Sequence, residues 1–305
     1  MVLLLLRHVS QTPEVYKKCR SADNCTILAD EYRQMKLISE ALQVSGNTIL
    51  SSTPIEFYGH DDAEFWDDPT LVFPEGDATR TCAYSMTRVY PLPSALKGKL
   101  IDLFCPLHLN KNTNALVRRG HHLARLLLGR PEPNASRSAP QRFFDTYNFP
   151  LTRGRMELLG INTVLLSGEM GRMLAQLHMT ARNDARDIEV VLGANITNPV
   201  PTRLERREPR VWVIDFNQVK EFNFTETQIP LLVDAFFANE AYFPRARSAD
   251  SLYNIFSKAY LEECNKIGEV AGQLGQKFIE ALEAEQVRKD ANRACAQEKM
   301  IPEWD

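Results

Sequence analysis

The most informative segment of this chain is LHMTARNDARDIEVVLG, residues 177–193. It ends a segment with the apolar spacing of a helix, crosses a polar loop rich in carboxylates, and begins an apolar run typical of a strand. A second strand-like run, VWVIDFNQ at residues 211–218, ends in Asp215 and Asn217. Because side chains at strand ends face the loops where ligands bind, the two runs together predict the floor of a cleft.

Toward the N-terminus, short strand-like runs accompany one helical segment. The strand-like runs are residues 2–6, 14–18 and 81–89. The apolar residues of 30–43 lie close to helical spacing, whereas the sequence PLP at 91–93 can continue neither a helix nor a strand. We therefore place a boundary there, between an N-terminal lobe of residues 1–92 and a C-terminal lobe of residues 93–305.

The C-terminal lobe is predicted to be mostly helical. Apolar residues recur near helical spacing in 94–104, 113–128, 163–179, 229–237, 251–264 and 268–295. Between these segments, residues 188–192 and 211–214 are short apolar runs of the strand type. The predicted fold class is therefore α+β, with a reduced N-terminal sheet and a mostly helical C-terminal lobe.

The composition is typical of a globular protein. With 44% apolar and 25% charged residues in 305, the chain can bury a core. Its opening apolar run is short and is followed by Arg7 and His8, unlike a signal peptide, and charged residues interrupt every longer apolar stretch. The six cysteines lack the spacing of a zinc site or a disulfide scaffold. We expect reduced thiols, no metal, no membrane insertion and a cytoplasmic location.

Charge is distributed unevenly along the chain, although the net charge is only −3. Residues 56–77 are acidic, whereas residues 111–157 and the segment from Arg203 to Arg210 are rich in basic side chains. Such basic segments can provide a docking face for a polyanion. They can equally be ordinary solvated surfaces, and the sequence leaves both interpretations open.

The order of these motifs resembles the C-terminal lobe of a protein kinase. A helix, a loop with His178 and Asp184, a strand, and a second strand ending in Asp215 follow one another in that order. In the N-terminal lobe, Lys17 resembles the strand lysine of a kinase, and Glu31 lies on the helix that would pair with it. The resemblance implies a protein-kinase-like bilobal fold.

Three departures from the kinase pattern argue against ordinary use of ATP. No glycine-rich phosphate loop precedes Lys17, carboxylates stand where a metal-binding Asn belongs, and Asn217 replaces the glycine that follows Asp-Phe. Backbone amides that would bind phosphates are therefore missing from the pattern. We expect a site that works without a cofactor.

A second resemblance covers most of the chain. Its motifs are RVYPLP (88–93), LIDLFCP (100–106), NFPL (148–151), DARDIEVVLG (184–193), WVIDFNQ (212–218) and AFFANEAYFPR (235–245). These motifs resemble a fungal protein family catalogued as a domain of unknown function. Some of its members are arginine-containing cyclodipeptide synthases, which join arginine and a second amino acid, both delivered on tRNA, into a diketopiperazine of secondary metabolism.

The resemblance implies an enzyme whose partners are arginyl-tRNA and one other aminoacyl-tRNA, with no DNA partner. Carboxylates suit this chemistry, because a guanidinium pairs bidentately with Asp or Glu and an attacking amine needs a base. We assign Asp187 and Glu189 to the reacting centre. Two residues apart on an extended segment, they point to the same side.

The other predicted site residues bind and orient the substrate. Asp184 or Asp215 would bind the guanidinium, and Asn217 together with His178 would orient the reacting groups. The competing interpretation is that this loop only caps the ends of a helix and a strand, with Asp184 and Asp187 bonded to backbone amides.

Two further functions fit the same sequence. The chain would be a phosphotransferase using Mg-ATP if Lys17, Asp184 and Asp215 bound the nucleotide. It would be a non-catalytic kinase-like binding module if the altered motifs had lost their chemistry. The sequence identifies neither the second amino acid nor the basic segment that meets tRNA.

Overall fold

The computed structural model describes residues 2–5, 13–71, 73, 79–106, 109, 123–132, 144–145, 147–196 and 207–298. Both helices and strands are present, which confirms a mixed α/β architecture. The chain forms two compact units. Unit 1 comprises Met1–Leu126, Glu132–Leu151 and Asp187–Val219, and unit 2 comprises Leu127–Pro131, Thr152–Arg186 and Lys220–Asp305.

The division into units differs from the boundary predicted after Leu92. Residues 93–126 and 187–219 belong to unit 1 together with the N-terminal part of the chain. The physical reason is strand pairing, because β3 (Leu50–Ser51) pairs in parallel with β9 (Arg207–Ile214). Proline residues mark the end of a local element and carry no information about such long-range pairing.

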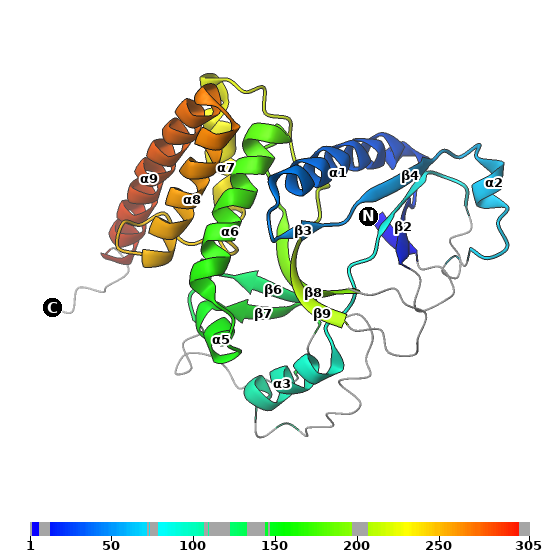
Figure 1. Cartoon of the computed structure of the whole chain (residues 1–305), viewed down its shortest axis with the longest axis horizontal. Helices are drawn as coiled ribbons and strands as arrows, with labels where there is room; N and C mark the ends of the chain where they lie inside the picture. Colours follow the sequence, from blue (N-terminus) through cyan, green and yellow to red (C-terminus); the bar gives the residue numbers. More distant parts are fainter. Residues whose placement is uncertain are drawn as a thin grey trace. The chain divides into compact units, whose positions relative to one another are not determined.

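The first sheet of unit 1 is antiparallel, with the strand order β1-β2-β5-β4. Its strands are β1 (Val2–Leu5), β2 (Glu14–Cys19), β5 (Ala83–Thr87) and β4 (Pro54–Tyr58). Helix α1 (Cys25–Ser45) contacts β2 and β4, and its buried residues include Leu28, Met35 and Leu42, which recur on one helical face (Figure 1). The strands and the helix predicted for this region are confirmed. Strand β4 was not predicted, and its Pro54 is the first residue of an edge strand, a position where proline is tolerated.

The second sheet of unit 1 has the strand order β3-β9-β8-β6-β7. At its centre, β8 (Glu189–Ile196) and β9 pair antiparallel, with Glu189 opposite Ile214. β6 (Ala124–Leu127) pairs with β8, and β7 (Phe149–Thr152) forms the edge. The two strands predicted after His178 are confirmed, and their pairing places the ends of both strands side by side.

The helix predicted over residues 113–128 is wrong at its C-terminal end, where the chain forms strand β6. Residues 113–122 lie outside the described part of the chain. The run ARLLL fits a helix or a strand equally well, and the pairing of Arg125 with Val191 decides for the strand. Helix α3 (Ser94–Phe104) has the bounds predicted for it, whereas the short α2 (Ala63–Trp66) was not predicted.

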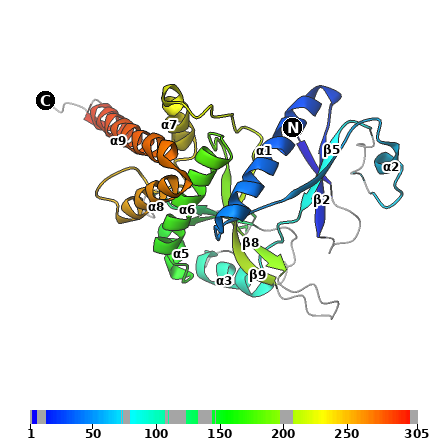
Figure 2. The same cartoon turned by 45° about the horizontal axis from the view of Figure 1, so that its top comes forward.

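Helices dominate the described part of unit 2 (Figures 1 and 2). They are α5 (Arg153–Leu158), α6 (Thr163–Ala175), the π-helical turn η2 (Gln176–Thr180), α7 (Ile229–Ala238), α8 (Ser251–Ile267) and α9 (Glu269–Glu298). α6 packs against α8, and both α7 and α8 pack against α9. The helices predicted for this half of the chain are therefore confirmed.

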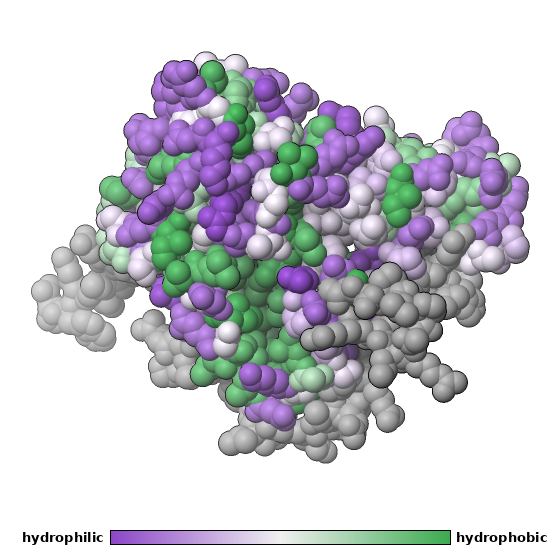
Figure 3. All heavy atoms as spheres, in the orientation of Figure 1, coloured by the Kyte–Doolittle hydropathy of each residue, from purple (hydrophilic) through white to green (hydrophobic). Residues whose placement is uncertain are grey.

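Aromatic rings fill the core of unit 2, whereas its longest helix is polar outside. Phe236 stacks on Phe243 with ring centroids 5.2 Å apart. The ring centroids of Phe278 and Tyr260 are also 5.2 Å apart. Hydrophilic side chains cover much of the face that α9 presents in Figure 3. Among the described residues, no helix combines the length and the apolar character needed to cross a membrane.

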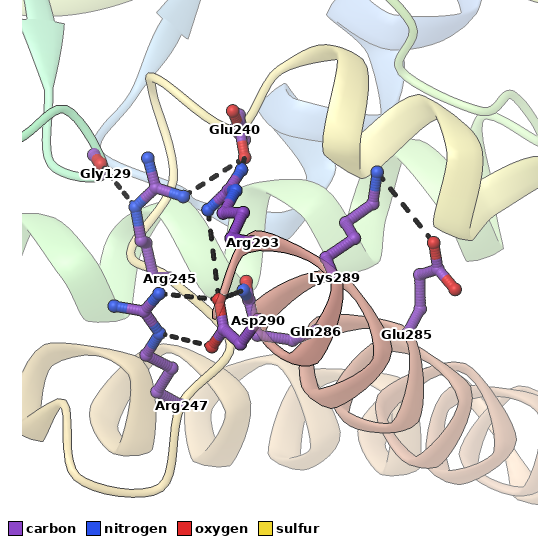
Figure 4. Close-up of polar contacts among 9 residues, drawn as sticks. All are labelled: Gly129, Glu240, Arg245, Arg247, Glu285, Gln286, Lys289, Asp290 and Arg293. Carbon is purple, nitrogen blue, oxygen red and sulfur yellow. Dashed lines mark hydrogen bonds and ion pairs between the residues drawn. The ribbon is translucent and has the colours of Figure 1, made fainter. Parts of the chain in front are cut away.

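Ion pairs fasten the segment after α7 to helix α9 within unit 2 (Figure 4). Arg247 donates two hydrogen bonds of 2.7 Å, one to each carboxylate oxygen of Asp290. Arg293 contacts both Asp290 and Glu240, and Glu240 also accepts a hydrogen bond from Arg245. The hydrogen bonds from Arg247 hold the pKa of Asp290 below its ordinary value. These contacts give the charged groups a structural role.

The expectation of reduced thiols is wrong for one pair of cysteines. Cys25 and Cys82 form a disulfide, with Cα atoms 5.7 Å apart and a sequence separation of 57 residues. The remaining four cysteines are free thiols. Cys25 is the first residue of α1 and Cys82 directly precedes β5, so the packing of helix on sheet brings the two together. Sequence spacing alone does not reveal such a pair.

Candidate active site

Three carboxylates gather at one end of the β8–β9 pair. Glu189 is the first residue of β8, and Asp215 directly follows Ile214, the last residue of β9. Because Glu189 lies opposite Ile214 in the register, Glu189 and Asp215 occupy the same end of the sheet. Asp187 lies just before β8 at that end. We call Asp187, Glu189 and Asp215 the acidic cluster.

Two members of the acidic cluster have a left-handed backbone conformation. The φ angle is 59° at Asp187 and 66° at Asp215. A side chain makes this conformation unfavourable, because Cβ crowds the neighbouring carbonyl oxygen. Such residues persist only where the surrounding structure enforces them, and they concentrate at functional sites. The surrounding structure therefore fixes the backbone conformation that presents these two carboxylates, as it does at other residues such as Ala185.

A buried ion pair accompanies the acidic cluster in unit 1. Nζ of Lys17 on β2 contacts Oε1 of Glu31 on α1, and the hydroxyl of Tyr84 on β5 donates to the same oxygen at 3.3 Å. The Lys17 and Glu31 side chains are only 12% and 2% exposed. This contact confirms the predicted pairing of the strand lysine with the helix glutamate.

Electrostatic interactions join this ion pair to the acidic cluster. Burial raises the pKa of Asp215, the ammonium group of Lys17 lowers it in part, and the carboxylate of Asp187 raises it again. Burial likewise raises the pKa of Glu31, with Lys17 acting in the opposite direction and Asp215 adding to the increase. Carboxyl groups with raised pKa values beside a cation are typical of sites that exchange protons.

Glu189 is held by an arginine of its own chain. Nη2 of Arg125 on β6 contacts Oε1 of Glu189, and the two side chains are 37% and 20% exposed. Burial raises the pKa of Glu189, whereas Arg125 lowers it. The sequence did not single out Arg125, because this residue lay within a predicted helix and its only signal was membership of a basic segment. One carboxylate of the acidic cluster thus already binds a guanidinium.

Amide side chains lie at the exposed side of the acidic cluster. The side-chain amide of Gln218 donates a hydrogen bond to Oδ2 of Asp187, and both residues are exposed. Asn217, the predicted orienting amide, is also exposed. Asp187, Glu189, Asp215 and Asn217 therefore all belong to unit 1, and Gln218 extends this set.

His178 is a core residue of unit 2. Its side chain is 1% exposed, Nδ1 lies 3.0 Å from the hydroxyl of Tyr260, and its ring centroid is 5.1 Å from that of Phe278. Burial lowers the pKa of His178 to about 3, although a hydrogen bond with the backbone of Asp184 opposes the shift. The histidine is therefore neutral near pH 7. The predicted contact of His178 with substrate does not fit this apolar environment.

Asp184 also belongs to unit 2, where it fastens the backbone. Its Oδ1 accepts hydrogen bonds from the backbone N–H groups of Arg186 at 3.0 Å and Lys220 at 2.8 Å. The side chain is 0% exposed. For Asp184 the predicted bonding to backbone amides is therefore correct, although both amides lie in loops and not at a helix or strand end. The predicted contact with a guanidinium substrate is not supported. Asp187 differs, because its carboxylate accepts a hydrogen bond from the side chain of Gln218.

Comparison with known protein families gives a short match. Residues 211–271, a fifth of the chain, match the family DUF3669, which is described as a zinc finger protein. The matched segment extends from β9 to the beginning of α9. No curated protein and no solved structure matches the chain.

The matched segment does not fit a zinc finger by its residues. It contains Cys264 as its one cysteine and no histidine, whereas structural zinc is held by four ligands, mostly Cys and His. Among the described residues, the group of metal-binding side chains close enough to share an ion is Cys19, Cys25 and Cys82. Two of these sulfur atoms are joined to each other, so the group offers no zinc site in this state.

Proposed function

We propose that this protein is a tRNA-dependent cyclodipeptide synthase with a kinase-like fold, which condenses arginyl-tRNA with a second aminoacyl-tRNA into an arginine-containing diketopiperazine. The observation that carries the proposal is the acidic cluster, in which Glu189 already binds the guanidinium of Arg125. The guanidinium is the group that distinguishes arginine from other amino acids. The resemblance of the sequence motifs to the fungal synthases supports the same substrate.

The proposed reaction needs orientation and a base, because an aminoacyl ester is already activated. The α-amine of one aminoacyl group attacks the ester carbonyl carbon of the other, the amide bond forms, and the tRNA hydroxyl leaves with the former ester oxygen. The remaining α-amine then attacks the remaining ester, which closes the ring and releases the second tRNA. Each attack transfers one amine proton to a base, and the leaving tRNA oxygen takes up one proton to become the hydroxyl.

The geometry favours Asp215 as that base and Asp187 as the ligand of the guanidinium. Asp215 is partly buried with a raised pKa, and Lys17 balances its charge. Asp187 is exposed and therefore accessible to a substrate cation. Glu189, occupied by Arg125, is a positioning residue in this scheme. The assignment exchanges the roles that the sequence suggested for Asp187 and Asp215.

A direct test is expression in a heterologous host, followed by mass spectrometry of the culture for arginine-containing diketopiperazines. We expect product from the wild type and at least a hundredfold loss in Asp215→Asn, because a positioned base contributes about 10² to 10⁴ in rate. Glu40→Gln is the matched control, since Glu40 is an exposed carboxylate on α1 in the same unit. Soluble wild-type protein without product, or full activity of Asp215→Asn, would contradict the proposal.

The Lys17–Glu31 ion pair favours a second candidate, a phosphotransferase that uses Mg-ATP. In that case Lys17 would contact the phosphates and Asp215 the metal ion. A magnesium-dependent increase in Tm with ATP, abolished in Lys17→Met, would support this candidate. Loss of diketopiperazine after ribonuclease treatment of a cell-free reaction would support the synthase. A protein inactive in both assays would be a binding module.

A further inference from the structure

Three cysteines meet in unit 1, two of them six residues apart and the third 57 residues further along the chain. The Sγ atoms of Cys19, Cys25 and Cys82 all lie within 4.8 Å of one another. Cys25 and Cys82 form the disulfide, and Cys19 is a buried free thiol beside it. A disulfide needs two sulfur atoms, so the third requires its own explanation.

Cys19 donates hydrogen bonds to backbone carbonyl groups on both sides of this disulfide. Its thiol donates a hydrogen bond of 3.2 Å to the carbonyl oxygen of Asn24, the residue before Cys25. Its backbone N–H donates to the carbonyl oxygen of Cys82 at 3.0 Å. Cys19 is the last residue of β2, which pairs with β5 beside Cys82. These contacts hold the Cys19 sulfur next to the bonded pair.

We propose that Cys19, Cys25 and Cys82 form a thiol–disulfide exchange site, in which Cys19 displaces Cys25 from Cys82. The Cys19 thiol loses its proton to solvent, and the thiolate attacks Sγ of Cys82. The Cys19–Cys82 bond forms, the Cys25–Cys82 bond breaks, and Cys25 leaves with the electron pair and takes up a proton. One disulfide replaces another, so the exchange needs no external oxidant or reductant.

Cys25 is the better leaving group of the two bonded sulfurs. It is the first residue of α1, a helix of 21 residues, and a helix N-terminus stabilises a thiolate. A thiol with a lower pKa leaves faster in exchange. Cys25 is also partly exposed, whereas Cys19 and Cys82 are 1% and 2% exposed. The exchange thus moves the reactive thiol from a buried position to an accessible one.

The exchange changes how α1 is attached to the sheet. Before it, the disulfide ties the beginning of α1 to the beginning of β5; after it, the bond joins β2 to β5 and leaves α1 untethered. The same three elements carry Lys17, Glu31 and Tyr84. The exchange therefore determines whether a disulfide restrains the helix that carries Glu31. This consequence does not depend on the reaction that the acidic cluster performs.

The exchange depends on pH in a defined direction. Burial raises the pKa of the Cys19 thiol, so this group is mostly protonated near pH 7. Because the thiolate is the nucleophile, the exchange rate rises about tenfold per pH unit below that pKa.

Peptide mapping without reduction tests the site on the intact protein. Trypsin cuts after Lys18, Arg20, Arg33, Arg80 and Arg88, so the three cysteines lie in three separate peptides. Free thiols are alkylated with iodoacetamide after incubation at pH 7 and at pH 9, and the digest is analysed by mass spectrometry. We expect Cys25 linked to Cys82 at pH 7, and a second species at pH 9 in which Cys19 is linked to Cys82 and Cys25 is alkylated.

Two variants control for other thiols and for folding. Cys295→Ser removes the exposed thiol and should leave the two species unchanged, which excludes exchange through Cys295. Cys19→Ser should show the Cys25–Cys82 link alone at both pH values. Recovery of Cys19 only as an alkylated thiol in the wild type at pH 9 would overturn the proposal. Zinc bound stoichiometrically by the reduced wild type and lost in Cys19→Ser would also overturn it, because the cluster would then be a metal site.

Discussion

At the scale of single residues, the acidic cluster combines backbone strain with raised pKa values. Asp187 and Asp215 have φ angles of 59° and 66°, a region that favours glycine. Aspartate occupies both positions, although glycine adopts this backbone conformation more readily. A site that needs carboxylates at fixed positions accounts for this, because residues selected for function are often not those that maximise stability.

The strain at Asp187 predicts an unusual order of stability. We expect Asp187→Gly to be more stable than Asp187→Ala by about 1 kcal/mol, because alanine keeps the Cβ that is unfavourable at positive φ. Both variants lose the contact with Gln218, so the comparison isolates the backbone. The free energy of unfolding in urea provides the measurement. Asp102 is the control, since it lies exposed within α3, where the glycine variant should be the less stable one by about 1 kcal/mol.

The Lys17–Glu31 pair predicts that removing one partner is worse than removing both. Lys17→Met leaves the Glu31 carboxyl, 2% exposed, without its cation, and we expect a loss of about 3 kcal/mol in unfolding free energy. The double variant Lys17→Met with Glu31→Leu should lose less than the single variant, since both charges of this pair are removed together. Lys36→Met, at an exposed lysine of α1, should change little. A double variant less stable than Lys17→Met would contradict this account.

At the scale of elements, the close packing of α6 on α8 depends on one glycine. A Cβ at Gly171 would lie 2.3 Å from the backbone carbonyl oxygen of Phe256. Backbone atoms cannot rotate away as a flexible side chain can, so the helices would have to separate. The contact between these helices buries Phe256 and Tyr260, which are part of the core of unit 2.

We expect Gly171→Ala to lower the unfolding free energy by about 2 kcal/mol, the range observed for overpacked cores. Gly98→Ala is the matched control, because Gly98 lies within helix α3 and a Cβ there would meet no atom within 4 Å. That variant should gain up to about 1 kcal/mol from the higher helix propensity of alanine. Thermal or urea unfolding of both variants measures the difference, and equal effects would show that the close approach at Gly171 is not limiting.

At the scale of the whole molecule, His178 makes stability depend on pH. Its ordinary pKa is 6.5, and burial lowers the pKa in the folded protein to about 3. Between these values the unfolded chain binds a proton that the folded protein does not bind. Stability is therefore retained above pH 6.5 and decreases as the pH falls toward 3, by about 1.4 kcal/mol per pH unit for one proton.

Raised carboxyl pKa values at Glu31, Glu189 and Asp215 act in the opposite direction, because protonation of these groups favours the folded state. The contribution of His178 is therefore measured as a difference between wild type and His178→Gln. Urea unfolding at pH 7, 6, 5 and 4 should show the wild type losing stability more steeply than the variant. Parallel curves for the two proteins would mean that His178 titrates normally in the fold.

The local elements of this protein were predictable from residue patterns alone. The periodicity of apolar residues located α1, α3, α6, α8 and α9 and the strands on both sides of the acidic loop, because this periodicity is a property of neighbouring residues. The pairing of Lys17 with Glu31 was also predictable, since a strand lysine and a helix glutamate in this order follow a known pattern.

Which segments contact one another became known from the three-dimensional packing. It made residues 124–127 a strand, supplied Arg125 to Glu189, joined Cys25 to Cys82 and enclosed His178 in a core. Strand pairing, burial and disulfide formation are long-range contacts, and a local pattern of residues carries no information about a partner that lies more than fifty residues away in the chain. The acidic loop after His178 therefore divides into two roles, with Asp184 fastening the backbone of unit 2 and Asp187 and Glu189 joining Asp215 at the strand ends of unit 1.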